Sequence, residues 1–127
     1  MTDIATAREA FDLFAQGWTT GNFDPYIAVL AEEMMFWFPM GAHRGKFSGP
    51  EGRQQMVAKC RGHEAAGDRL TFSEPQYVLN DDTSVMFEFE SEGLYAGQPY
   101  KGHNAIAFEV NHGKVVSLRE YFGDLGA

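Results

Sequence analysis

Alternating apolar and polar positions in residues 100–122 predict a β-hairpin whose two faces differ sharply in polarity. A three-residue loop ending in glycine joins the two halves, and this common hairpin connection pairs Val110 with Lys114. A slip of one residue would turn an apolar face outward, so the hydrophobic pattern favours this register. In this register two polar side chains, Asn104 and Glu120, face each other on an otherwise apolar face. We take this pair as the candidate site.

The first half of the chain has the periodicity of helices. Residues 3–20 place apolar side chains at helical spacing and predict an amphipathic helix that ends at Gly21. A short helix is expected over residues 24–32 and a third over residues 48–63, each with a proline in its first turn. Between these two, residues 34–40 are too apolar for a solvent-facing strand. They predict a strand whose proline either ends its regular pairing or places it at a sheet edge.

Strand-like segments fill the second half of the chain. Residues 70–79 and 85–93 predict two antiparallel strands that precede the hairpin. The expected fold is therefore α+β, with a cone-shaped, strongly curved, mostly antiparallel sheet wrapped around three N-terminal helices and enclosing a pocket. The other face of the sheet would carry Trp37, Val115 and Tyr121, and a homodimer would cover them.

Length and composition fit a single domain over residues 1–127. The chain is 44% hydrophobic with eleven phenylalanines, which predicts an aromatic interior. Its net charge of −8 and the lack of a basic stripe argue against nucleic acid or an anionic membrane surface as a partner. The single cysteine, Cys60, cannot form an internal disulfide, and the first residues lack the pattern of a signal peptide. We therefore expect a cytoplasmic protein.

Four short segments carry a resemblance to a known group of proteins. They are Gly21–Asp24, Phe38–Gly41, Gly113–Arg119 and Glu120–Gly123, and together they span nearly the whole chain. In order and spacing they resemble the nuclear transport factor two-like superfamily, which includes ketosteroid isomerases and SnoaL-like polyketide cyclases. The resemblance implies a cone-shaped pocket for a small apolar or aromatic molecule and, commonly, a homodimer.

The same resemblance argues against a true ketosteroid isomerase. Those enzymes place a catalytic aspartate immediately before the Pro-X-Gly of the first strand, where this chain has Phe38. Their oxyanion-hole tyrosine matches Phe14, and their second oxyanion donor, a protonated aspartate, matches Ile106. A dienolate mechanism needs a base and donors for the developing charge, and all three groups are missing at these positions.

The remaining polar pair suggests a different proton-transfer site. SnoaL-like relatives often carry an asparagine and an acidic residue in these two strands. A carboxyl group at Glu120, among apolar neighbours, would be desolvated, and its pKa would rise toward neutrality. Asn104 could orient this carboxyl or donate its amide hydrogens to a ligand carbonyl. The hypothesis is proton transfer on an apolar carbonyl compound, either an isomerisation or an aldol-type ring closure.

Each candidate also has a simpler interpretation. Glu120 could be a solvated or arginine-paired carboxylate at a sheet edge, and Asn104 could satisfy only Glu120 or a loop backbone group. The predicted ligand contacts are a loop histidine at the pocket rim and a set of apolar side chains, which would be plain core if the cone is filled. They are His43, Phe14, Trp18, Phe36, Phe38, Phe87, Phe89, Ile106, Leu118 and Phe122.

Two alternatives to an enzyme stay open. One is a protein of the same fold that binds a small apolar ligand without chemistry, and the other is a structural dimer module with a filled pocket. None of the four histidines forms a His-x-His or His-x-x-x-His pair, so we expect no metal site, and we expect no cofactor.

Overall fold

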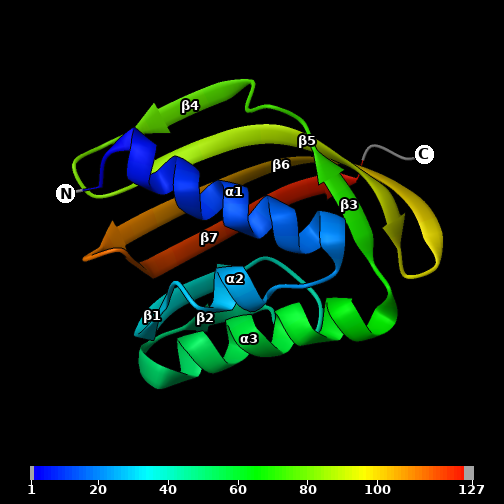
Figure 1. The fold of residues 1–127 in the computed structure, drawn as a ribbon, viewed down its shortest axis with the longest axis horizontal. Coiled ribbons are helices and arrows are strands. Elements are labelled where there is room, and N and C mark those ends of the chain that lie inside the picture. The colour runs from blue at the N-terminus through cyan, green and yellow to red at the C-terminus, as the bar shows by residue number, and fades with distance from the viewer. Residues whose placement is uncertain (1, 125–127) are drawn as a thin grey trace.

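Three helices lie against one face of a bent sheet in the computed structural model, which describes residues 2–124, with side chains to residue 123 (Figure 1). The helices are α1 (Ile4–Thr20), α2 (Asp24–Ile27) and α3 (Gly49–Ala66). The strands are β1 (Leu30–Phe38), β2 (Gly45–Phe47), β3 (Arg69–Phe72), β4 (Tyr77–Asn80), β5 (Val85–Tyr95), β6 (Gln98–Asn111) and β7 (Lys114–Asp124). The predicted α+β class and the curved sheet around N-terminal helices are confirmed.

The seven strands form one sheet in the order β2-β1-β7-β6-β5-β3, and β4 also pairs with β5. All these pairs are antiparallel except β1 with β7, which is parallel. Figure 1 shows α1 lying along β5, β6 and β7, while α2 and α3 lie beside β1 and β2. The helices and the concave side of the sheet therefore bound a common interior.

The first helix follows its sequence pattern closely. Asp3 caps it by accepting a hydrogen bond from the backbone N–H of Thr6 at 2.7 Å, and Gly21 ends it with φ 77°. Its apolar stripe is buried, and Phe11 packs edge-on against Phe89 with ring centroids 5.0 Å apart. The aromatic interior expected from the composition is thus largely a packed core.

The second helix is shorter than predicted. It ends at Ile27, and residues 30–33 belong to β1 instead of a helix continuing to residue 32. Pairing with β7 overrides the local helical pattern, because the backbone N–H of Val115 donates to the carbonyl of Val29 at 2.7 Å and Leu30 pairs with Val115. The proline at position 39 ends β1 as expected.

The single strand predicted over residues 70–79 is wrong, because the chain forms β3 and β4 with an interruption around Pro75. Both pieces remain attached to β5. The backbone N–H groups of Ser73 and Gln76 donate to the carbonyls of Glu90 and Glu88, both at 2.8 Å.

The predicted register of the C-terminal hairpin is also wrong. The loop has two residues, His112 and Gly113, with φ 51° and 74°, and Asn111 pairs with Lys114 across it. Positive φ at both central residues is the geometry of a type I′ turn, whose twist matches that of the strands. Val110 therefore does not pair with Lys114.

A β-bulge follows this turn in β7. Val116 is the extra residue, because the residues on either side of it pair with consecutive residues of β6. Beyond the bulge Glu120 lies opposite Ile106, and Asn104 lies opposite another residue, Phe122. The two-residue turn also pairs Val115 with the buried Val110 and so turns it into the core, where it is 1% exposed; the prediction that this residue lies on the outer face is wrong.

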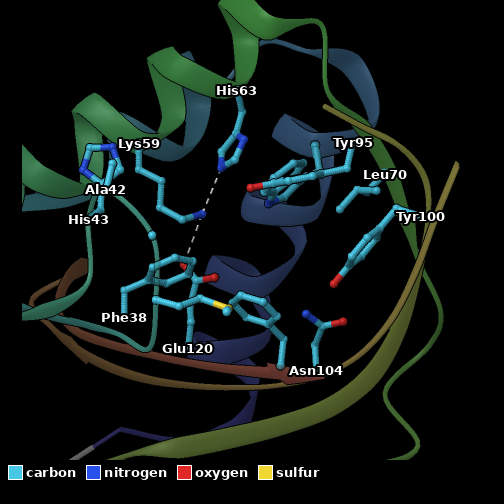
Figure 2. A pocket seen from close by; sticks show the side chains of 14 residues that line it. Phe38, Ala42, His43, Lys59, His63, Leu70, Tyr95, Tyr100, Asn104 and Glu120 are labelled. Carbon is cyan, nitrogen blue, oxygen red and sulfur yellow. Dashed lines mark hydrogen bonds and ion pairs between the residues drawn. The ribbon is translucent and has the colours of Figure 1, made fainter. Parts of the chain in front are cut away.

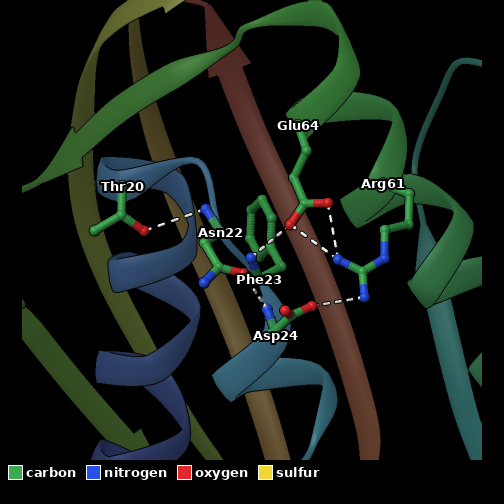
Figure 3. A network of polar contacts seen from close by, with 6 residues as sticks. All are labelled: Thr20, Asn22, Phe23, Asp24, Arg61 and Glu64. Carbon is green, nitrogen blue, oxygen red and sulfur yellow. Dashed lines mark hydrogen bonds and ion pairs between the residues drawn. The ribbon is translucent and has the colours of Figure 1, made fainter.

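A polar network fixes the junction of α1 and α2 against α3 (Figure 3). The backbone N–H of Phe23 donates to Glu64 Oε2 at 2.6 Å, and this hydrogen bond is the main cause that lowers the pKa of Glu64. Arg61 binds both Glu64 at 2.9 Å and Asp24 at 2.7 Å. The network holds the buried Phe23 ring against Trp18, with ring centroids 5.8 Å apart.

Glu64→Ala is expected to lower the free energy of unfolding by about 1 kcal/mol, because the N–H of Phe23 loses a charged acceptor. Asp24→Ala removes the other partner of Arg61, in an exposed ion pair, and should cost less than about 0.5 kcal/mol. Urea unfolding of both variants at neutral pH measures the two values. Equal losses would show that the hydrogen bond to Phe23 contributes nothing specific.

Candidate active site

A pocket of about 420 Å³ lies between α1, α3 and the concave side of β6 and β7 (Figure 2). Such a volume is typical of sites for small organic molecules. Most of its wall is apolar or aromatic, with a few polar side chains from α3, β6 and β7. The apolar and aromatic members are Trp18, Phe38, Met40, Ala42, Leu70, Tyr95, Tyr100 and Phe122.

Glu120 projects from β7 into this pocket and is 6% exposed. Its Oε1 atom has no hydrogen-bond partner among the described residues. Burial raises the pKa of Glu120 above its ordinary value, and the nearby Lys59 ammonium offsets this increase only in part. The pocket therefore contains a carboxyl group that holds a proton more readily than a solvated glutamate.

Lys59 projects from α3 toward Glu120 and is equally buried, at 5% exposed. Its Nζ lies 3.7 Å from Glu120 Oε1, which is an ion pair but too long for a hydrogen bond. The ammonium also lies 4.6 Å from the ring centre of Phe38 and 5.3 Å from that of Trp18. These contacts place the Lys59 ammonium beside two aromatic rings that also line the pocket.

His63 continues this line of polar groups. Its Nε2 lies 3.2 Å from the Nζ of Lys59, and its Nδ1 lies 2.7 Å from Oδ2 of Asp68. Asp68 is buried and also accepts a hydrogen bond from the backbone N–H of Ala96 at 2.9 Å. A polar chain thus runs from Asp68 through His63 and Lys59 to Glu120.

These contacts define the tautomer of His63. The ammonium of Lys59 has only protons to donate, so Nε2 of His63 accepts, and Nδ1–H donates to the Asp68 carboxylate. Burial, and then the charge of Lys59, lower the pKa of His63 to about 4. His63 is therefore neutral at physiological pH.

Asn104 also lines the pocket, but its carbonyl is already occupied. Oδ1 accepts a hydrogen bond from the hydroxyl of Ser91 at 2.8 Å, which leaves the amide nitrogen directed toward the pocket (Figure 2). His43 lies across the pocket in the loop after β1, where its Nδ1 is 2.9 Å from Oε1 of Gln55. Asn104 and Glu120 thus share the pocket without being cross-strand partners.

The structure brings together part of the predicted site. Glu120, Asn104, Trp18, Phe38, His43 and Phe122 all line the pocket. Six other residues predicted as ligand contacts are fully buried in the core and do not line it, because their side chains pack against one another and against the helices. They are Phe14, Phe36, Phe87, Phe89, Ile106 and Leu118.

Sequence reasoning missed the basic half of the site. Lys59 and His63 fall at helical spacing with the apolar residues Met56 and Cys60; Lys59 shares their buried face of α3, and His63 is half-buried at its end. A lysine and a histidine on the apolar stripe of a helix were the sequence signal that could have indicated these two site residues. Asp68, just beyond the helix, carries no comparable signal in its local sequence.

The arrangement can transfer a proton inside an apolar cavity. Glu120 supplies a carboxyl group with a raised pKa, while Lys59 and the amide of Asn104 supply donors for a developing negative charge. Within residues 2–123 no group of three or more His, Cys, Asp or Glu side chains could hold a metal ion.

A family model described as a SnoaL-like domain matches residues 11–118. The chain belongs to the SnoaL-like domain family. Among solved structures, this SnoaL-like domain is similar to an NTF2-like protein from Anabaena variabilis, with 36% identity and a TM-score of 0.81 over 97% of this chain and 94% of that one. No curated protein matches the chain.

More distant structures share the fold of this SnoaL-like domain. A candidate polyketide cyclase from Xanthomonas campestris is 19% identical, with a TM-score of 0.72 over 94% of this chain and 91% of that one. A candidate isomerase from Bacillus subtilis is also 19% identical, with a TM-score of 0.73 over 97% of this chain and 90% of that one. In the described part of the SnoaL-like domain, no helix is long and apolar enough to span a membrane.

Proposed function

We propose that this SnoaL-like domain is an enzyme that transfers a proton on a small apolar carbonyl compound, in an isomerisation or an aldol-type ring closure. Glu120 is the acid–base group. The observation that carries the proposal is a buried carboxyl with a raised pKa, facing an aromatic-lined pocket with one oxygen that has no hydrogen-bond donor among the described residues. The relatives named as a candidate polyketide cyclase and a candidate isomerase agree with such chemistry.

In the proposed step the carboxylate of Glu120 removes a proton from the carbon next to the ligand carbonyl. The electron pair of the broken C–H bond forms a C=C bond, and negative charge develops on the carbonyl oxygen. The amide nitrogen of Asn104 and the ammonium of Lys59 stabilise that charge. Glu120 then returns its proton to a different carbon, or the enolate carbon attacks a second carbonyl of the same molecule.

The raised pKa suits this role. A stronger base removes a carbon-bound proton more easily, so the rate should increase with pH as Glu120 loses its proton and level off above its raised pKa. The apolar wall excludes water, which increases the effect of each fixed donor on the developing charge. The positions of the ketosteroid isomerase groups remain apolar, since Phe14 and Ile106 are core residues.

The test uses 2-tetralone, a two-ring ketone, and follows exchange of its α-hydrogens for deuterium by NMR. Glu120→Gln should slow the catalysed exchange at least about 100-fold while the ketone still binds. Glu88→Gln makes the same change outside the pocket, beside His103, and should leave the rate unchanged. Equal exchange by wild type and Glu120→Gln would contradict the proposal.

Two other outcomes would identify the alternatives. If the ketone raises the thermal midpoint of unfolding but exchange stays at the rate of the buffer, the protein binds without catalysing this step. If neither 2-tetralone nor related aromatic ketones raise the midpoint, the pocket does not take such molecules and the proposal fails.

A further inference from the structure

Lys59 differs from every other lysine of the chain. Lys46, Lys101 and Lys114 are exposed, whereas the amine of Lys59 is buried in the pocket wall. A solvated lysine is protonated and unreactive, whereas a lysine amine desolvated in an apolar pocket can serve as a nucleophile. The position of this amine inside the pocket is the starting point of the inference.

Both polar neighbours of Lys59 are proton acceptors. His63 presents the lone pair of Nε2 at 3.2 Å, and Glu120 presents a carboxylate oxygen at 3.7 Å. Asp68 holds His63 in this orientation through Nδ1. His63 therefore orients the Lys59 nitrogen as a hydrogen-bond acceptor, and Glu120 is the group placed to take its proton.

An apolar ligand would strengthen this effect. In a wet pocket the Lys59 ammonium and the Glu120 carboxylate are both partly stabilised by water. An aromatic ligand that displaces the water desolvates the Lys59–Glu120 ion pair further, and this favours the two neutral groups over the two charges. Transfer of a proton from Lys59 to Glu120 then yields a neutral amine beside the ligand and a carboxylic acid beside the amine.

We propose that Lys59 attacks the carbonyl carbon of the ligand and forms an imine with it. This inference deepens the proposed function, on whose carbonyl ligand it rests, and it makes Lys59 a catalytic residue. The protonated imine nitrogen then takes over the part given above to the Lys59 ammonium, because it replaces the carbonyl oxygen on which the charge would develop. The imine also compensates for the missing oxyanion-hole donors at positions 14 and 106, where this chain has Phe14 and Ile106. A protonated imine accepts the electron pair that an oxyanion hole would otherwise have to stabilise.

The step balances in atoms and charge. After proton transfer to Glu120, the amine forms an N–C bond, the carbonyl π bond breaks, and a nitrogen-bound proton moves to the oxygen. The Glu120 carboxylic acid then protonates the resulting hydroxyl, which leaves as water while the C=N bond forms. The ammonium and the carbonyl have become a protonated imine and water, and Glu120 is again a carboxylate, ready to remove the α-proton.

The experiment traps the imine with 2-naphthaldehyde and sodium cyanoborohydride, whose hydride reduces C=N to a stable secondary amine. Peptide mapping by mass spectrometry then locates the naphthylmethyl group on the intact wild-type protein. Lys59 should be modified at least about tenfold faster than Lys46, Lys101 or Lys114, which serve as internal controls. An excess of 2-tetralone without reductant, added beforehand, should slow modification of Lys59 alone.

Variants separate the roles of the two groups. Lys59→Met removes the amine and should abolish the pocket label, and Lys59→Arg keeps the cation but cannot form the imine. Glu120→Gln removes a proton acceptor from Lys59 and should slow its labelling. Because the mapping is done on wild type, the result does not depend on whether any variant folds.

The outcomes of this experiment and of the exchange assay are distinguishable. Labelling confined to the amino terminus and the three exposed lysines would overturn the imine, even if Glu120→Gln still abolished deuterium exchange. Labelling of Lys59 without exchange that depends on Glu120 would support the imine and refute proton transfer by Glu120.

Discussion

Gly52→Ala is expected to lower the free energy of unfolding by about 3 kcal/mol or more. Gly52 is buried in the first turns of α3, where the helix crosses β1. A Cβ atom there would overlap the backbone carbonyl oxygen of Met34 and lie 3.2 Å from that of Phe47. Backbone atoms of paired strands cannot rotate away, so the helix itself would have to move outward.

Gly62→Ala is the matched control in the same helix. It is exposed, and a Cβ atom there meets nothing within 4 Å. Alanine favours a helix over glycine, so this variant should be about 0.5–1 kcal/mol more stable than wild type. Chemical denaturation of both variants measures the two changes, and a small loss for Gly52→Ala would show that α3 is not seated tightly on β1.

The seating of α3 also matters for the pocket, because the same helix carries Lys59 and His63. An outward shift at Gly52 would withdraw the amine of Lys59 from Glu120. If Gly52→Ala folds, it should therefore lose imine trapping, whereas Gly62→Ala should retain it.

Acid should destabilise the protein through His63. The pKa of this histidine is about 4 in the folded chain against an ordinary value of 6.5, so the unfolded chain takes up the proton first as the pH falls. Above pH 6.5 His63 is neutral in both the folded and the unfolded chain, so it does not change the free energy of unfolding. Between pH 6.5 and pH 4 the folded state loses about 3 kcal/mol relative to the unfolded state, and below pH 4 the loss is complete.

Groups around His63 modify this profile. Lys59 and Asp68 contact it, and His43 adds a smaller repulsion. Glu120, whose folded pKa is raised, has the opposite sign, because the folded state takes up its proton first and gains stability as the pH falls toward 4.5. Glu120 therefore offsets part of the contribution of His63, while Glu64, whose folded pKa is lowered, adds to it as the pH falls.

His63→Gln isolates that contribution, since glutamine can keep one hydrogen bond to Asp68 and one to Lys59 but does not titrate. The free energy of unfolding of wild type minus that of the variant should fall by about 3 kcal/mol between pH 7.5 and pH 4. Urea unfolding at several pH values measures this difference. Parallel curves for the two proteins would mean that His63 is protonated with equal ease in both states.

Local patterns predicted the helices well because capping and periodicity are properties of neighbouring residues. Asp3, Gly21 and the apolar stripe of α1 act within the helix that they define. The prediction over residues 24–32 is wrong from position 28 onward, because parallel pairing with β7 decides that segment and its partner is far away in sequence.

In the candidate site, too, the features set by local sequence were predicted and those set by distant segments were not. Alternation in the hairpin gave the correct face for Glu120, since the true turn and bulge displace the pairing by an even number of residues. It gave the wrong partner, because a bulge leaves no mark in the hydrophobic pattern. Lys59 was missed for a different reason: its pairing with Glu120 joins elements that only the tertiary fold brings together.

The bulge at Val116 makes the chemistry of the pocket depend on chain length. Pairing that ran from the same two-residue turn without a bulge would place Arg119 opposite Ile106, and it would turn Glu120 toward the outer face. A guanidinium would then occupy the position of the carboxyl, although no residue of this part of β7 had been substituted. In this hairpin an insertion or deletion of one residue can replace the carboxyl group in the pocket by a guanidinium, although the inserted or deleted residue lies outside the pocket. A comparison of aligned side chains would not reveal such an evolutionary step.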